Sequence, residues 1–314
     1  MQRYEVINEQ IKEKFQQYKK DHPQRLEKRL KLGWNSCLFG FEEMERSLER
    51  LARYNVPYVE IGGHWGGDYE HYDAAELNRL FAAYGVRCSG VCGLFYNGNT
   101  LSSPDRFIRN RAKEYIAHEL DLCQAIGATY LLVVPGTTGQ YTAFDTCDFE
   151  RSAKALGDMA EMFEKKGVKC ALETVNAMET QMVNTIDETI AYIQEIGRPG
   201  FGHINGDVYH MQLEERHIGE AILKAGDLLV NLHMADSNRK PIGQGSLDLD
   251  TVIRALYLIG YNEGERFVTA EPIGLGRRMS HLLSAKHDPK WLDERVRDST
   301  LYFREREEAV LAEA

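Results

Sequence analysis

The chain has 314 residues, of which 43% are hydrophobic and 27% charged, and its formal net charge is −10. This composition is that of an ordinary globular protein, and the length suits one large α/β domain. The negative charge disfavours nucleic acid as a partner. Neither an apolar leader segment nor an apolar stretch of membrane-spanning length occurs in the sequence, so we expect a cytoplasmic protein with no membrane partner.

The predicted elements begin with a charged, helix-prone stretch at residues 1–30, which we interpret as an N-terminal helical extension. Between 31 and 314, apolar β-like runs alternate with segments of helical periodicity. The eight predicted strands are LGWNSCLF, YVEIGG, VRCSGVCG, YLLVVPG, KCALETV, FGHINGDV, LLVNLHMA and RFVTAEP. Gly85, Gly127 and Gly167 each follow a predicted helix, where a left-handed residue commonly ends it.

These eight strand-helix units predict the fold class, a single (β/α)8 TIM barrel over residues 31–314 with the added helix before it. Strands such as YLLVVPG are almost continuously apolar, which is typical of parallel strands buried on both faces. An open doubly wound sheet is the main alternative fold. However, no GxGxxG or GxxxxGK[ST] motif follows the first strand, and we therefore expect no nucleotide cofactor.

Four side chains of metal-ligand type stand at the ends of four consecutive predicted strands: Glu173, Asp207, His233 and Glu271. A parallel barrel brings these strand ends to one rim. Three carboxylates and one imidazole suit a single divalent ion, with Mn²⁺ first and Mg²⁺ or Co²⁺ as alternatives. Each residue alone has another explanation, a helix cap or a core histidine. Their equivalent positions favour one shared site.

Further polar residues follow the same strand ends. His210 lies three residues after Asp207 and could reach a substrate hydroxyl or orient a metal ligand, although a simple loop histidine is the alternative. Asp236 and Arg239 precede a glycine-bearing loop that could shape a polyol pocket. Asn176 and His64 are further substrate-binding candidates.

The segments ALETVN, GDVYHMQLEE, HMADSNR and TAEP resemble the xylose isomerase-like barrel superfamily, in particular its ketose 3-epimerases, over residues 32 to about 300. The resemblance implies that Glu173 and Glu271 are both metal ligands and the paired acid and base of catalysis. It also implies that His210 and Arg239 hold substrate oxygens.

Within that superfamily, HINGDVYHMQ, HMADSNR and GQGSLDLDT are more similar to the catalytic barrel subunit of bacterial C-glycoside deglycosidases. That resemblance implies abstraction of a proton beside the carbonyl of a 3-keto-C-glycoside, followed by β-elimination of the aromatic aglycone. It further implies a small β-rich partner subunit. The charged stretch before Leu32 departs from the compact start of the epimerases.

Other functions remain open at this point. A ketose 3-epimerase or a related sugar isomerase would share the same proton-abstraction step, with a free sugar as substrate. An apurinic endonuclease-like nuclease would need additional histidines on the third and fourth strands, whose ends read GVCG and VVPG. A non-catalytic barrel predicts eroded ligand positions, whereas all four are filled by competent donors.

Overall fold

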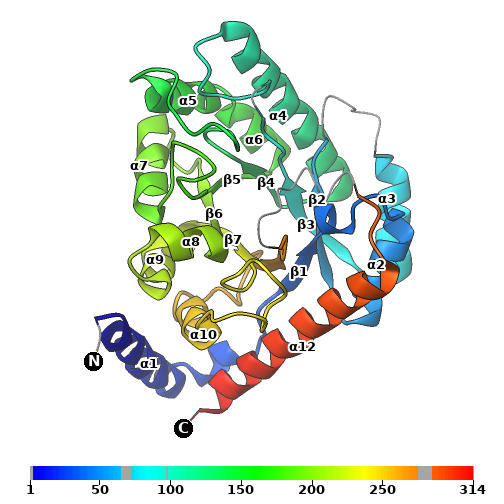
Figure 1. Ribbon diagram of the computed structural model, residues 1–314, viewed down its shortest axis with the longest axis vertical. Coiled ribbons are helices and arrows are strands. Elements are labelled where there is room, and N and C mark those ends of the chain that lie inside the picture. Colours follow the sequence, from blue (N-terminus) through cyan, green and yellow to red (C-terminus); the bar gives the residue numbers. More distant parts are fainter. Residues whose placement is uncertain (1–2, 65–71, 97, 275–284, 314) are drawn as a thin grey trace.

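The fold is the predicted TIM barrel, seen in a computed structural model that describes residues 3–64, 72–96, 98–274 and 285–313. Eight parallel strands close in the order β1 to β8, and helices surround them (Figure 1). The strands are β1 (Leu32–Asn35), β2 (Tyr58–Gly62), β3 (Arg87–Cys92), β4 (Tyr130–Val133), β5 (Lys169–Glu173), β6 (His203–Asp207), β7 (Leu229–Met234) and β8 (Phe267–Ala270).

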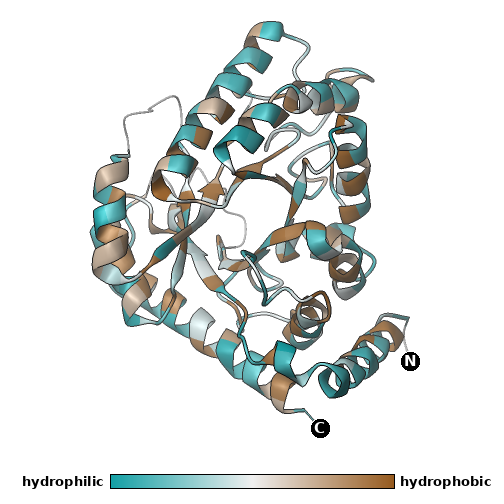
Figure 2. Ribbon diagram, turned by 180° about the vertical axis from the view of Figure 1, so that it is seen from behind, coloured by the Kyte–Doolittle hydropathy of each residue, from teal (hydrophilic) through white to brown (hydrophobic). Residues whose placement is uncertain are grey.

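The described helices are α1 (Arg3–Asp21), α2 (Met44–Arg53), α3 (Ala74–Tyr84), α4 (Arg106–Ile126), α5 (Asp148–Gly157), α6 (Ala160–Lys166), α7 (Ile186–Ile196), α8 (Val208–Glu214), α9 (Ile218–Ala225), α10 (Leu249–Leu258) and α12 (Pro289–Ala312). They carry both hydrophobic and hydrophilic residues (Figure 2), as expected for helices with one face against the barrel. Within the described ranges, no helix combines the length and apolarity needed to cross a membrane.

Local sequence signals explain where many helices begin and end. The Asp73 carboxylate accepts hydrogen bonds from the first backbone N–H groups of α3, and Thr185 forms a reciprocal capping box with Glu188 at α7. The predicted left-handed C-terminal residues are confirmed, with φ of +64° at Gly85, +70° at Gly127 and +67° at Gly167. Glycine adopts this left-handed backbone conformation without steric strain because it has no Cβ.

Two predicted boundaries differ from the structure. The single helix expected after β4 is divided into α5 and α6, with Gly157, a poor helix former, at the division. The first strand stops at Asn35, whose side chain accepts a hydrogen bond from Cys37 N and starts a 3₁₀ turn, Ser36–Phe39.

The predicted N-terminal helix is present as α1 and packs on the outside of the barrel beside α9 and α10 (Figure 1). Ile11 and Phe15 are buried in this contact. Asn8 donates to Asp248 Oδ2 at 2.7 Å and contacts His217 Nε2 at 2.7 Å. The helix is therefore an integral packing element.

The barrel interior changes character along the strands. At the N-terminal ends, Tyr58 and Phe267 pack edge to face with ring centroids 5.0 Å apart, and Tyr130 completes an aromatic plug. Gly90 makes room for it, since a Cβ there would lie 2.3 Å from the Tyr130 ring. Further along the strands the interior becomes polar. Glu60 of β2, Asn205 of β6, Asn231 of β7 and Thr269 of β8 are all fully buried.

Candidate active site

A pocket of about 410 Å³ opens at the C-terminal ends of the strands. Its lining combines charged and polar side chains with apolar and aromatic ones. Among the lining residues are Cys92, Gly93, Leu94, Phe95, Tyr96, Val134, Tyr141, Glu173, Met178, Glu179, Tyr209, His210, Arg239, Glu271 and Gly274. This is the face at which TIM-barrel enzymes carry their active sites.

The four predicted metal ligands converge beneath this pocket. Glu173, Asp207 and His233 each offer a ligand atom within 4.8 Å of the others. Glu271 directly follows β8 and places its Oε1 3.5 Å from His233 Nδ1. Glu173 and Glu271 line the pocket, whereas Asp207 and His233 are almost fully buried behind it.

The electrostatics of this group fit a bound divalent cation. Burial raises the pKa of Glu271 to about 8, and the charges of Asp207 and Glu173 add to the increase while His233 and Arg239 oppose it. Burial alone would lower the pKa of His233, but Glu271 and the other surrounding carboxylates raise it well above its ordinary value. Both groups thus retain protons that a cation would displace, as is usual when a metal binds.

His210 and Asn176 form a pair at the start of α8. Asn176 Nδ2 lies 2.5 Å from His210 Nδ1, and His210 Nε2 lies 3.4 Å from Asp207 Oδ2. If Asn176 donates to Nδ1, the proton of the neutral ring is on Nε2, toward Asp207 and the pocket. Asn176 is fully buried behind His210, so it orients this histidine and does not itself line the pocket.

Arg239 extends over the pocket floor from the loop after β7. Its guanidinium lies 4.6 Å from the centroid of the Tyr209 ring and 3.7 Å from Glu271 Oε2, and it forms an ion pair of 3.1 Å with Glu179. The backbone is left-handed at Arg239, with φ +56°. Gly274 N donates to its carbonyl at 2.6 Å, which holds this unusual conformation.

Asp236 lies in the loop that presents Arg239. Its carboxylate accepts hydrogen bonds from the backbone N–H groups of Ser237, Gly243 and Leu247, at 2.7, 2.7 and 3.0 Å. It is not among the residues that line this pocket. These hydrogen bonds stabilise the loop, and a contact between Asp236 and a substrate stays a prediction.

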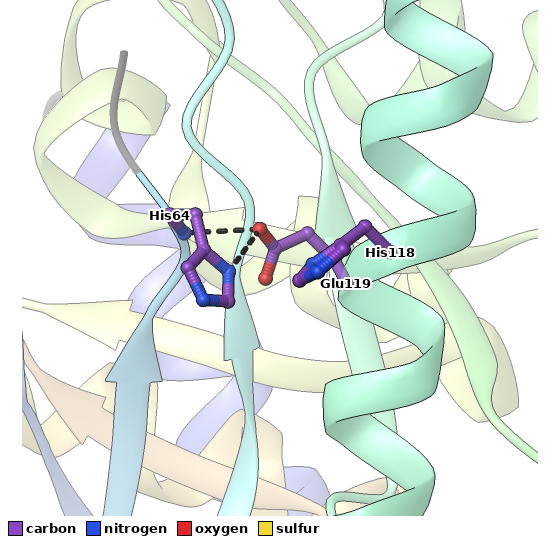
Figure 3. A group of neighbouring side chains, drawn as sticks. All are labelled: His64, His118 and Glu119. Carbon is purple, nitrogen blue, oxygen red and sulfur yellow. Dashed lines mark hydrogen bonds and ion pairs between the residues drawn. The ribbon is translucent and has the colours of Figure 1, made fainter. Parts of the chain in front are cut away.

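His64 likewise lies outside the pocket lining. Glu119 of α4 accepts from both the backbone N and the ring Nδ1 of His64, at 3.0 and 2.8 Å, and His118 lies beside them (Figure 3). These three residues also offer ligand atoms within 4.8 Å of one another. The direct hydrogen bonds show that Glu119 fixes the segment after β2 against α4.

Sequence reasoning missed a layer of buried polar residues beneath the ligands. Glu60 accepts from Tyr130 Oη at 2.7 Å and lies 2.9 Å from His233 Nε2. Asn205 Nδ2 donates to Glu173 Oε1 at 3.2 Å, and Asn35 Nδ2 donates to Glu271 Oε1 at 3.0 Å. The sequence did contain a signal for this layer, namely a charged or amide residue inside an apolar strand, as in YVEIGG. Such residues are buried only when they have hydrogen-bonding partners, so each one predicts further polar side chains nearby.

The comparisons with known proteins agree with this geometry. Residues 48–295 match the model of the xylose isomerase-like TIM barrel family. The chain is 31% identical over 193 residues to ketose 3-epimerase of Arthrobacter globiformis, which covers 61% of this chain and 66% of that relative, just under two thirds. It is 25% identical over 268 residues to D-psicose 3-epimerase of Agrobacterium fabrum, covering 82% and 91%.

Among solved structures, D-allulose 3-epimerase from Methylomonas sp. in complex with D-allulose superposes with a TM-score of 0.76 at 25% identity. The match covers 89% of this chain and 98% of that one. These similar proteins are sugar epimerases, as the resemblance predicted. The family match spans most of the sequence, and the chain therefore belongs to the xylose isomerase-like TIM-barrel family.

Proposed function

We propose that this chain is a divalent-metal-dependent sugar epimerase that moves a proton on the carbon beside a sugar carbonyl, with 3-epimerisation of a ketose as its reaction. The observation that carries this proposal is the pair Glu173 and Glu271, which line one pocket from β5 and from the end of β8. The epimerase relatives support the same reaction class.

Glu173, Asp207, His233 and Glu271 would hold the cation. A bound divalent cation supplies Lewis-acid polarisation of the sugar carbonyl. One pocket glutamate removes the proton from the adjacent carbon, the electron pair of that C–H bond passes into an enediolate, and the other glutamate returns a proton to the opposite face.

Two cationic or hydrogen-bonding groups would orient the sugar. Arg239 is buried, carries guanidinium N–H donors at the pocket floor, and its carboxylate neighbours raise its pKa further although burial opposes this. His210 is held by Asn176 at 2.5 Å. Both can hold substrate oxygens in a fixed position, which is the main requirement for a well-aligned proton transfer.

C-glycoside deglycosidation, the reaction implied by the resemblance of the sequence motifs, is the second candidate. The relatives named above support the epimerase better. One observation still favours an aromatic substituent on the sugar: the pocket lining includes Phe95, Tyr96, Tyr141, Tyr209 and Met178. Aromatic side chains stack well on flat aglycones. Deglycosidation would also imply a small β-rich partner subunit, which stays a prediction.

The experiment incubates Mn²⁺-loaded protein in D₂O with free ketoses and, separately, with a 3-keto-C-glucoside. We expect deuterium at C3 and a C3 epimer from a ketose. Aglycone release, alone or only with a small partner protein, would instead support deglycosidation. Glu173→Gln and Glu271→Gln should each slow turnover by roughly 10²–10⁴-fold, because the proton-transfer group is lost.

Glu263→Gln makes the same chemical change at a surface ion pair with Lys28 and should leave turnover unchanged. The proposal would be wrong if wild-type protein exchanged no substrate hydrogen with solvent, or if both pocket variants retained the wild-type rate.

A further inference from the structure

Glu60 is a buried carboxylate that the sugar chemistry outlined above does not use. It lies in the middle of β2 and is 0% exposed. Four groups surround it: Asn35 Nδ2 at 2.8 Å and His233 Nε2 at 2.9 Å from Oε2, and Tyr130 Oη at 2.7 Å and Asn231 Nδ2 at 3.2 Å from Oε1. A buried carboxylate is costly, so a chain that keeps one fully hydrogen-bonded gains something from its position.

The contact with His233 defines what that position does. His233 Nε2 faces Glu60, while Nδ1 lies 3.2 Å from Glu173 Oε1 and 3.5 Å from Glu271 Oε1. A carboxylate accepts but cannot donate, so Nε2 carries a proton. In the neutral ring the lone pair is then on Nδ1, the nitrogen that faces the proposed cation.

A second connection runs from Glu60 to Glu271. Asn35 Oδ1 accepts from the backbone N of Cys37 at 2.9 Å, which fixes the orientation of this amide. Its Nδ2 must therefore face the two carboxylates, and it donates to Glu60 Oε2 at 2.8 Å and to Glu271 Oε1 at 3.0 Å. Glu60 is thus one contact from His233 and two contacts from Glu271.

We infer that Glu60 is a positioning residue for the metal site: it holds the His233 ring and its Nε2–H tautomer directly, and it positions Glu271 through Asn35. This inference rests on the proposed function, because it assumes that these residues hold a divalent cation. Histidine ligands in metal sites commonly donate their second N–H to a carboxylate, which fixes the ring and increases its basicity.

Glu60→Gln tests the inference with little change in volume. Either orientation of the new amide places an NH₂ group against existing donors: His233 and Asn35 on one side, Tyr130 and Asn231 on the other. With the NH₂ group toward His233 the ring loses its acceptor, and with the amide oxygen there the ring keeps only a neutral acceptor in place of the carboxylate. Loss of such a supporting group typically weakens metal binding by about 10–100-fold. We expect that loss in Mn²⁺ affinity, measured by calorimetric titration of metal-free protein, and a partial return of turnover at saturating Mn²⁺.

Two matched variants separate positioning from general damage to the core. Glu119→Gln removes another 0% exposed carboxylate that binds a histidine ring, His64, but outside the pocket (Figure 3). Tyr130→Phe removes one partner of Glu60 without touching His233. Both should bind Mn²⁺ with wild-type affinity. Melting temperatures of the metal-free variants establish that each is folded.

The possible results distinguish failure of the proposed function from failure of the positioning role of Glu60. Wild-type protein that binds no divalent cation would contradict the proposed function itself. Wild-type affinity in folded Glu60→Gln, or an equal loss in Glu119→Gln, would overturn the positioning role and leave the proposed function intact. If Glu60→Gln does not fold, Asn35→Ala decides: the inference requires weaker Mn²⁺ binding in this variant, and unchanged binding contradicts it.

Discussion

Each of the two pocket glutamates is held by one amide from an adjacent strand. Asn205 of β6 donates to Glu173 of β5, and Asn35 of β1 donates to Glu271 after β8. These amide hydrogen bonds restrict the rotamers of the two carboxylates. The groups beside them that can carry a positive charge are His233, 3.2 Å from Glu173 Oε1, and Arg239, 3.7 Å from Glu271 Oε2. This arrangement suits the proposed role, in which each glutamate both binds a cation and exchanges a proton.

At the start of β6, His203 makes the stability of the protein depend on pH. Burial, aided by the charge of Lys169, lowers its pKa from 6.5 to about 4. As pH falls below 6.5 the unfolded chain binds this proton first, so the stability contributed by the neutral ring is lost progressively until about pH 4. We expect His203→Gln to lose less stability than wild type over this range, measured as urea midpoints. Parallel pH profiles for the two proteins would refute this.

The sequence predicts which side chains converge where a strand ends, but not which side chains meet where a strand runs through the barrel interior. Glu173, Asp207, His233 and Glu271 occupy equivalent positions along the chain, so their convergence follows from the topology. Glu60 has no such pattern, since its partners come from three other strands, β1, β4 and β7, and are adjacent only after closure. The local hydrogen bonds of Asp236 were likewise not predicted, although short carboxylates commonly bind nearby backbone donors.

At the scale of elements, α1 is attached by an apolar contact and by polar anchors at both ends. Phe15 is 0% exposed and lies 6.1 Å from the Tyr257 ring of α10, centroid to centroid. Asn8, near the start of the helix, donates to Asp248 Oδ2 at 2.7 Å. Near its end, Lys19 Nζ donates to the carbonyl oxygens of Leu311 and Glu313 at 2.6 and 2.5 Å. The first helix therefore secures the last one.

Truncation of Phe15 tests this attachment. Phe15→Ala should lower the free energy of unfolding by about 3–5 kcal/mol, because the substitution removes a fully buried ring and leaves a cavity. Phe107→Ala is the matched control, since Phe107 of α4 is 72% exposed, and it should change stability by less than about 0.5 kcal/mol. Denaturant unfolding measures both. Similar effects of the two substitutions would show that α1 contributes little to the fold.

Helix boundaries were predictable where capping chemistry is local, as at Thr185 and Gly85. The division of the helix expected after β4 was not predictable in this way. The chain from Asp148 to Lys166 has continuous helical periodicity, yet α5 ends at Gly157 and α6 begins at Ala160. Glycine is a poor helix former, but its presence alone does not fix where a helix ends.

For the whole molecule, the concentration of carboxylates at the rim predicts a strong response to cations. Addition of Mn²⁺ to metal-free protein should raise the melting temperature, with a stabilisation of about 2.7 kcal/mol when free Mn²⁺ is 100-fold above its Kd. Turnover should disappear after thorough chelation and return with Mn²⁺. Asp207→Asn, which removes one ligand charge, should show a smaller thermal shift. Equal melting temperatures with and without Mn²⁺ would contradict the proposed cation site.

The fold class was predictable as a whole because eight apolar runs, each followed by an amphipathic segment, leave few alternatives to a closed parallel barrel. The polar network inside the barrel was not predictable, because it depends on the register of the strands, which decides which inward-facing side chains lie at the same height. The bulge between Val59 and Glu60 in the β2–β3 pairing changes that register locally.

Closure of the barrel has a consequence for the timing of enzyme maturation. Strand β1 pairs with β8, and Asn35 reaches Glu271 across that seam. During synthesis, a ribosome must release more than four fifths of the polypeptide before residue 271 can dock beside residue 35. Nascent chains, and chains truncated before residue 271, consequently lack the proposed acid–base pair, and emergence of the final strand completes the sheet and the candidate active site together.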